Sequence, residues 1–118
     1  MTEKQKIPLI FYRTPAGREP VREWYKGHSK EDRDTLGADL QRVQWQFPIG
    51  MPLCRPMGAG LYEVRSTLTN NRIARVLFCL YRNQIVALHA FIKKTATTPD
   101  ADLELARKRQ KEIEHEEK

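Results

Sequence analysis

The sequence predicts one α+β domain over residues 1–118, with two helices packed on a mainly antiparallel four-stranded sheet and a third helix at the end. The length suits a single hydrophobic core, since domains of about 100–150 residues are the commonest size. Apolar residues recur at helical spacing in residues 20–47, and three β-rich runs follow in residues 61–92. Because the strands are grouped and do not alternate with helices, the order β-α-α-β-β-β-α indicates an α+β architecture.

The first third of the chain predicts one strand and two helices. The β-branched and aromatic run Ile7–Tyr12 is typical of a strand. Pro20 suits the first turn of a short helix, which Gly27 ends. Ser29 is a good N-cap for a longer helix, and Pro48 stops it because the residue before a proline avoids the α conformation. The apolar stripe of this longer helix, which we expect to face the core, is Leu36, Leu40, Val43 and Phe47.

The rest of the chain predicts a loop, three strands and a closing helix. Residues 48–60 are rich in proline and glycine, so we expect an irregular loop there. Short polar turns separate the next three runs, and connections this short join antiparallel neighbours. The three predicted strands are Leu61–Leu68, Ile73–Tyr81 and Ile85–Ile92. Thr98 as N-cap and Pro99 in the first turn predict a last helix over residues 99–114, with a charged tail that we expect to fray.

Positive charge is concentrated in the strand region. The whole chain carries 21 Lys and Arg against 15 Asp and Glu, a formal net charge of +6. Six of these cations but only one acidic residue, Glu63, fall within residues 61–98. A concentrated basic field attracts polyanions, and nucleic acid is the usual partner of such a protein. The same cations also fit a plain solubilising role, so the charge alone leaves both interpretations open.

The composition argues against several other classes of protein. No apolar stretch approaches the roughly 20 residues of a transmembrane helix. The run Ile7–Tyr12 is too short for the core of a signal peptide, so we expect the protein in the cytoplasm. Two cysteines, Cys54 and Cys79, and three scattered histidines are too few ligands for structural zinc. We therefore expect no metal or cofactor, and we expect both cysteines to be buried thiols.

Basic residues on the predicted strands indicate a site for phosphate. Strand alternation places Arg65 on the open face of the sheet, away from the two helices. Arg75 lies on the neighbouring strand, and Lys93 and Lys94 follow the last one. We expect these side chains to form a cationic basin, because arginine binds phosphate bidentately and a lysine of lowered pKa transfers protons. Metal-free RNA cleavage requires such groups, although the pattern equally allows a passive binding face.

A few further residues are candidates for functional roles. Three residues are candidates for contacts with RNA: Arg55 in the loop, Tyr62 in the first of the three strands and Arg72 in the turn after it. For Tyr62, stacking on a base competes with a place in the core. His89 titrates near neutrality and is a candidate base, but its apolar strand favours a hydrogen-bonded structural histidine.

Three segments carry a resemblance to a known family. The first is Leu-Tyr-Glu-Val-Arg at residues 61–65, and the second is Arg-Ile-Ala-Arg-Val-Leu-Phe at residues 72–78. The third is Leu-His-Ala-Phe-Ile-Lys-Lys-Thr at residues 88–95, followed by Thr98 and Pro99, and its Phe-Ile-Lys-Lys-Thr part is the most specific. Over about residues 7–114 the chain resembles the HigB-like, phage-associated branch of the RelE/ParE toxin superfamily.

The resemblance implies a RelE-like fold and the toxin of a type II toxin–antitoxin module. Members of the HigB-like and RelE-like branches are typically ribosome-dependent mRNA endonucleases that use no metal and leave a cyclic phosphate. By position, Arg65 and Arg75 would hold and polarise the scissile phosphate, while Lys94, together with Lys93, would supply a further cation. One departure concerns the late tyrosine of RelE-like active sites, because no tyrosine follows Tyr81. The general acid and base therefore stay unassigned.

The same resemblance implies a set of partners. These are mRNA and the ribosome, a small helix-turn-helix antitoxin of HigA type, and operator DNA reached only through the complex with that antitoxin; no membrane is implied. Two alternatives stay open. ParE-like members of the superfamily inhibit DNA gyrase without cutting RNA, and a non-catalytic basic protein would bind nucleic acid without being toxic.

Overall fold

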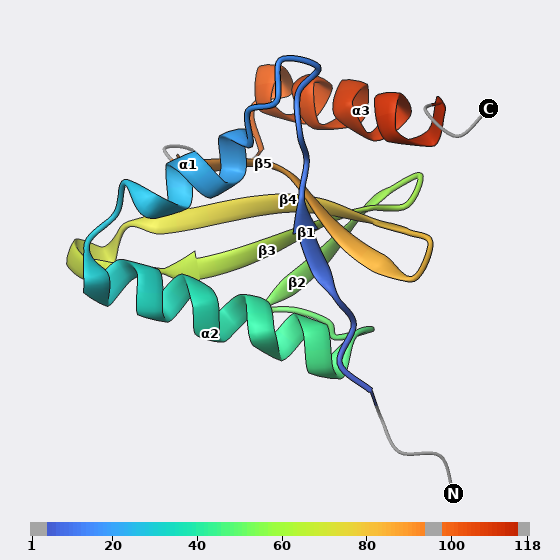
Figure 1. The fold of residues 1–118 in the computed structure, drawn as a ribbon. Coiled ribbons are helices and arrows are strands. Elements are labelled where there is room, and N and C mark those ends of the chain that lie inside the picture. The colour runs from blue at the N-terminus through green and yellow to red at the C-terminus, as the bar shows by residue number, and fades with distance from the viewer. Residues whose placement is uncertain (1–4, 94–97, 116–118) are drawn as a thin grey trace, which may run out of the picture.

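The computed structural model describes residues 5–93 and 98–115, and a five-stranded sheet with helices on both faces forms its core (Figure 1). The helices α1 (Pro20–Lys26) and α2 (Lys30–Gln46) pack on one face, and α3 (Asp100–His115) packs on the other. The strands are β1 (Leu9–Phe11), β2 (Cys54–Gly58), β3 (Leu61–Thr67), β4 (Ile73–Tyr81) and β5 (Gln84–Lys93). The predicted α+β class is confirmed, and both N-terminal helices lie where the sequence predicts them.

The sheet differs from the predicted one in its number of strands. Its spatial order is β1-β5-β4-β3-β2, with β1 parallel to β5 and the other neighbours antiparallel. The expected count of four strands, and the order β-α-α-β-β-β-α, are wrong because residues 54–58 pair with β3 instead of forming an irregular loop. Proline is tolerated on an edge strand, and Pro56 lies on the edge strand β2. Arg55 consequently belongs to a strand and not to a loop.

The helix ends follow the capping signals in the sequence. Ser29 Oγ accepts a hydrogen bond of 3.2 Å from the backbone N–H of Asp32 at the start of α2. Pro20 occupies the first turn of α1, and α2 stops one residue before Phe47, which precedes Pro48. These local rules place both helices within a residue or two of their predicted ends.

A tight hairpin joins β4 to β5 and sets their pairing. Its two loop residues, Arg82 and Asn83, have positive φ values of 52° and 62°, the backbone of a type I′ turn. The ladder that begins there has one irregularity and ends where Ile73 pairs with Lys93. The pairing set by this hairpin therefore places Lys93 at the same end of the sheet as the start of β4.

Two apolar clusters lie on opposite faces of the sheet. On the side of α1 and α2, Val21 and Val43 pack with Val64 and Phe78. On the side of α3, Ala106 packs with buried residues of three strands: Leu61, Leu77 and Leu88. Cys54 and Cys79 are buried free thiols, as predicted, and burial raises the pKa of each to about 11. With both faces covered, β4 and β5 carry apolar residues on both sides.

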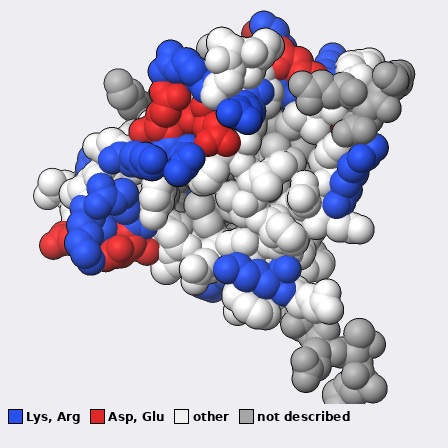
Figure 2. Space-filling model, in the orientation of Figure 1, with Lys and Arg blue, Asp and Glu red and all other residues white. Residues whose placement is uncertain are grey.

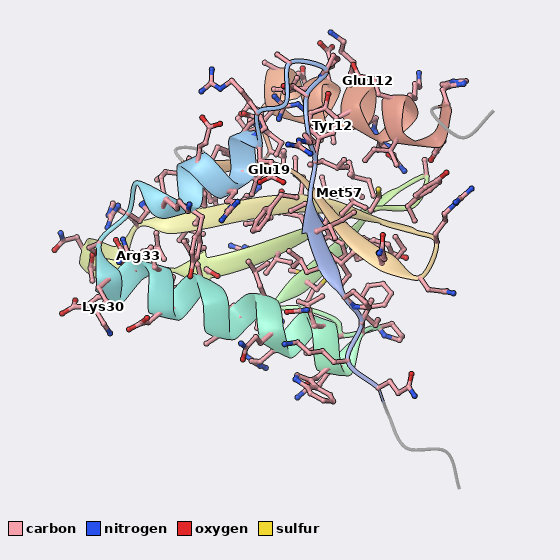
Figure 3. The ribbon with its side chains drawn as sticks, viewed as in Figure 1. Tyr12, Glu19, Lys30, Arg33, Met57 and Glu112 are labelled. Atoms are coloured by element: carbon pink, nitrogen blue, oxygen red, sulfur yellow. The ribbon has the colours of Figure 1, made fainter. Side chains whose placement is uncertain are left out.

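Polar contacts tie α3 to the sheet. Tyr12, just after β1, donates a hydrogen bond to Glu112 (Figure 3). Arg109 donates to the carbonyl of Leu88 at 2.8 Å, and the Gln110 amide donates to the carbonyl of Ala59 at 2.9 Å. Among the residues described, no helix is both long enough and apolar enough to cross a membrane.

Candidate functional site

The strand register brings three predicted site residues together. Arg65 on β3 pairs directly with Arg75 on β4, and paired residues point to the same face of a sheet. Lys93 pairs with Ile73, which lies two positions from Arg75 and so shares its face. Arg65, Arg75 and Lys93 therefore converge on the α3 face, at the end of the sheet next to the start of α3. We call these three residues the cationic cluster.

The electrostatics of Lys93 agree with this arrangement. Burial lowers the pKa of Lys93 from its ordinary value, and the positive charges of Arg75 and Arg65 lower it further, with Glu63 acting in the opposite sense. A lysine with a lowered pKa exchanges protons more readily near neutral pH. Burial and its two arginine neighbours thus shift the pKa of Lys93 in the direction that proton transfer requires.

Arg75 lies beneath the other two cations and is 1% exposed. Its Nη1 donates to Glu63 Oε2 at 3.3 Å and to Thr98 Oγ1 at 2.8 Å, and Thr98 Oγ1 donates to Glu63 Oε2 at 2.5 Å. Glu63 is fully buried, so this is a desolvated ion pair closed by the residues that lead into α3. Arg75 is therefore placed to orient the site and add charge from below, and its direct contact with phosphate stays a prediction.

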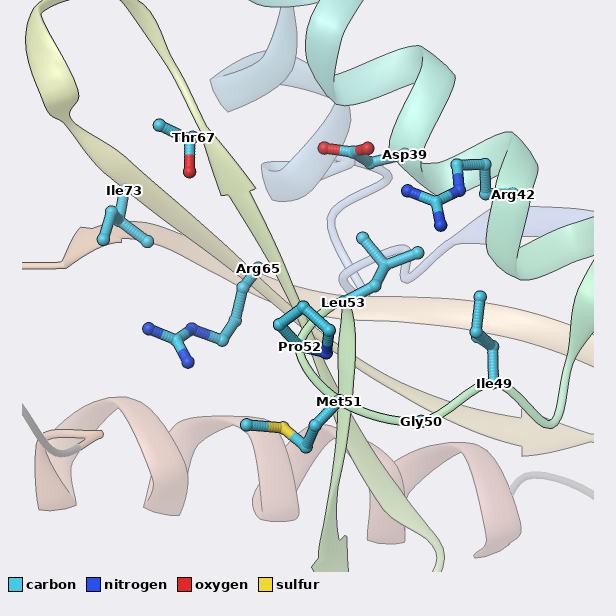
Figure 4. A pocket seen from close by; sticks show the side chains of 10 residues that line it. All are labelled: Asp39, Arg42, Ile49, Gly50, Met51, Pro52, Leu53, Arg65, Thr67 and Ile73. Carbon is cyan, nitrogen blue, oxygen red and sulfur yellow. The ribbon is translucent and has the colours of Figure 1, made fainter.

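Arg65 borders a pocket at the edge of the sheet (Figure 4). The pocket has a volume of about 470 Å³ and lies between α2, residues 49–53 and the C-terminal part of β3. The backbone N–H of Arg65 donates to the carbonyl of Leu53 at 2.9 Å, which fixes the loop against the strand. Figure 4 shows the Arg65 side chain on the opposite side of β3 from Asp39 and Arg42 of α2. Arg65 thus belongs both to the cationic cluster and to the lining of this pocket.

Tyr62, one of the predicted RNA-contact residues, does not lie at the cationic cluster. Tyr62 faces the helices: its ring stacks on Phe78 with centroids 5.4 Å apart and meets Phe47 edge-on at 5.0 Å. The structure therefore places the half-buried Tyr62 against the core on the opposite face from the cluster, and its contact with RNA stays a prediction. Strand alternation separates Tyr62 from its neighbour Glu63 in this way.

Arg72 lies in the connection between β3 and β4, as its spacing from Arg75 predicts. It forms an ion pair with the buried Asp32 of α2, whose pKa is held below its usual range by the Thr69 N–H and by Arg72. Arg72 therefore fixes α2 to this turn, and its contact with RNA stays a prediction.

Arg55 and Lys94 complete the predicted set. Arg55 on β2 is exposed and pairs with Glu63, so it shares the face of the cationic cluster and extends it by one strand. Lys94 lies outside the described residues. His89 Nε2 is 2.5 Å from Asp102 Oδ1 of α3, which favours the structural interpretation of that histidine.

A model of the phage-derived Gp49-like protein family matches residues 23–111. The chain belongs to the Gp49-like family. The match runs from α1 to α3 and includes the whole cationic cluster. Gp49-like proteins are of RelE/HigB-like toxin type, so the predicted resemblance is confirmed at the level of this family. No curated protein matches the Gp49-like chain.

Sequence reasoning missed Glu63 and Thr98 as parts of this Gp49-like site. A signal for Glu63 was present, because it is the one acidic residue of residues 61–98 and alternation puts it on the face of Arg65. Thr98 was expected only as a helix cap, and its contact with Arg75 depends on how α3 packs. Among the described residues of the Gp49-like chain, no group of three or more His, Cys, Asp or Glu side chains is placed to hold a metal ion.

Proposed function

We propose that the protein is the toxin of a type II toxin–antitoxin module and acts as a ribosome-dependent mRNA endonuclease. The observation that supports this most is the convergence of Arg65, Arg75 and Lys93 from three adjacent strands. Three cations held together cost free energy by mutual repulsion, and such arrangements are typical of sites for polyanions. The toxin type of the Gp49-like family supports the same proposal.

The proposed reaction uses the 2′-hydroxyl of the RNA as nucleophile. The 2′-oxygen bonds to phosphorus, the bond from phosphorus to the 5′-oxygen breaks, and the products are a 2′,3′-cyclic phosphate and a 5′-hydroxyl. One proton leaves the 2′-oxygen and one reaches the 5′-oxygen, so no other reactant is consumed. Arg65 would bind the non-bridging phosphate oxygens, and Lys93 would stabilise the added negative charge and exchange protons. Arg75 would act from beneath as a positioning residue, held by Glu63.

The proposed partners follow from this role. Messenger RNA in the ribosomal A site is the substrate, and a helix-turn-helix antitoxin would inhibit the toxin and carry the complex to operator DNA. Exposed Arg55 extends the basic face and is the described residue best placed to reach RNA or ribosome beyond the cluster.

The test is a translation reaction with purified ribosomes, with mRNA ends mapped by primer extension. Wild type should give codon-phased cuts, and Arg65→Ala and Lys93→Ala should each lower the cleavage rate by about 100-fold, the usual effect of removing one charge-stabilising group. Arg22→Ala, which removes an exposed arginine of α1, is the matched control and should cut normally. Intact mRNA with wild type, or unchanged cutting by both variants, would exclude the endonuclease; DNA damage with intact mRNA would indicate gyrase inhibition.

A further inference from the structure

We infer that the pocket beside Arg65 is a nucleotide subsite, which holds the RNA residue next to the cleaved linkage. This inference rests on the proposed function, because it takes Arg65 to bind the scissile phosphate. The pocket volume of 470 Å³ lies within the roughly 300–1,000 Å³ that is usual for small-ligand sites. Its position is decisive, since Arg65 lines the pocket and also belongs to the cationic cluster. An RNA phosphate on Arg65 therefore has one neighbouring nucleotide at the pocket.

The lining of the pocket has the two properties that a nucleotide needs. Apolar side chains come from the loop before β2, and one of them, Met51, is 57% exposed. Arg42 from α2 and Arg65 from β3 provide two guanidinium groups. Single-stranded RNA is bound by aromatic rings or guanidinium groups that stack on bases, combined with cations for the backbone. The pocket therefore offers a base apolar packing at Met51, and Arg42 and Arg65 provide cations on opposite sides of β3.

One carboxylate also lines the pocket, and a hydrogen bond holds it in place. Asp39 Oδ2 accepts a hydrogen bond of 2.7 Å from Ser66 Oγ. This bond holds the carboxylate against β3, where it joins α2 to the strand. With Arg42 one helical turn further on and Arg65 across the strand, the lining has one positive charge more than its acid neutralises. That balance favours an anionic occupant such as RNA.

The pocket walls are anchored, so the subsite is preformed. The loop is fixed by the Arg65 N–H bond to the carbonyl of Leu53 at 2.9 Å and by the Cys54 N–H bond to the carbonyl of Gly50 at 3.2 Å. The α2 wall is fixed by the contact between Asp39 and Ser66. A preformed site lowers the entropy that a bound nucleotide must lose.

The experiment measures binding without cleavage, so it does not depend on ribosomes. The probe is a fluorescent trinucleotide of 2′-O-methyl RNA, which has no free 2′-hydroxyl, and the readout is the Kd of the full chain by anisotropy. Arg42→Ala and Met51→Ala should each weaken binding about tenfold, the scale expected for losing one stacking or charge contact. Arg22→Ala and Trp45→Ala are the matched controls, since these residues are exposed on helices and outside the pocket lining.

The outcomes separate this inference from the proposed function. If Arg65→Ala weakens binding while Arg42→Ala and Met51→Ala stay within about twofold of wild type, the subsite is overturned and the endonuclease stands. If inorganic phosphate competes as well as adenosine 5′-monophosphate does, the pocket binds no base and the inference fails. If the two pocket variants bind RNA normally but lose neutralisation by the antitoxin, the pocket serves a protein partner and the inference is wrong. Because both side chains are exposed, unchanged thermal unfolding should confirm that the variants fold.

Discussion

The charges on the two faces of the sheet are arranged in opposite ways. Around α1 and the start of α2, cations lie beside acids, as Figure 2 shows, in the ion pairs Arg18–Glu23, Arg22–Glu19 and Lys30–Asp34. On the other face, β3, β4 and β5 bring together the three cations of the cationic cluster. These three strands contain one acidic residue, Glu63, which is buried. The ion pairs around α1 and α2 neutralise their charges in water, whereas the cationic cluster concentrates positive charge. Arrangement, more than net charge, therefore marks the candidate site.

The largest expected effect comes from breaking the buried ion pair between Glu63 and Arg75. Glu63→Gln leaves the buried guanidinium of Arg75 without its counter-ion and should destabilise the fold by about 3–5 kcal/mol, measured by urea unfolding. Glu23→Gln on the helical face removes an exposed pair and should cost less than about 1 kcal/mol. Equal losses in the two variants would show that burial does not distinguish the pairs. Replacing both partners, with Glu63→Leu and Arg75→Met, should restore much of the stability.

The next effect compares two lysines in RNA cleavage. Lys93→Met should lower ribosome-dependent cleavage by about 100-fold, because it removes charge stabilisation at the cluster. Lys30→Met removes a lysine paired with Asp34 on α2 and should leave the rate unchanged. A similar loss with both variants would indicate a general effect of net charge, and the cluster would lose its special role.

A smaller effect separates structural from binding arginines. Arg72→Ala removes the partner of Asp32 and should lower the urea midpoint while leaving the affinity for the 2′-O-methyl trinucleotide unchanged. Arg55→Ala removes an exposed side chain. It should leave the urea midpoint unchanged but weaken the affinity for the trinucleotide and the salt dependence of binding. Loss of RNA affinity in Arg72→Ala without loss of stability would contradict the structural role given to Arg72.

The smallest expected effect concerns pH. Because the pKa of Lys93 is lowered in the folded protein, the unfolded chain holds this proton to higher pH than the folded one does. Lys93 therefore disfavours folding at neutral pH, and this cost disappears as pH rises past the ordinary value of 10.5. Wild type should be less stable than Lys93→Met near pH 7, and the gap in urea midpoint should close at higher pH. A gap that stays constant with pH would mean that the charge of Lys93 is not its cause.

Local signals were sufficient for most of the fold. Ser29, Pro20 and Pro48 determine helix ends through backbone rules that act over a few residues, and β4 begins and ends where the sequence predicts. Strand β2 could not be predicted in this way, because Pro56 and Gly58 are typical of loops and their pairing is imposed by β3. Long-range pairing, unlike capping, leaves little trace in the segment that undergoes it.

The sequence was enough to predict which face of the sheet carries the candidate site, but not which of its side chains are buried. Alternation was enough to put Arg65 and Arg75 on the same side of two paired strands. It could not show that Thr98 and α3 cover Arg75, or that Tyr62 stacks on Phe78, because these contacts depend on how distant elements pack. The pocket beside Arg65 was missed for the same reason, since α2, a loop and β3 each provide one wall.

The parallel pairing of β1 with β5 has a consequence for how the protein is made. Translation produces β1 first, but its neighbour in the sheet is among the last segments to be synthesised. Closing so long a loop is entropically costly, so this edge joins late in folding. A nascent chain that stops before β5 also lacks Lys93 and cannot assemble the three cations. The cationic cluster is thus complete only once synthesis has passed Lys93.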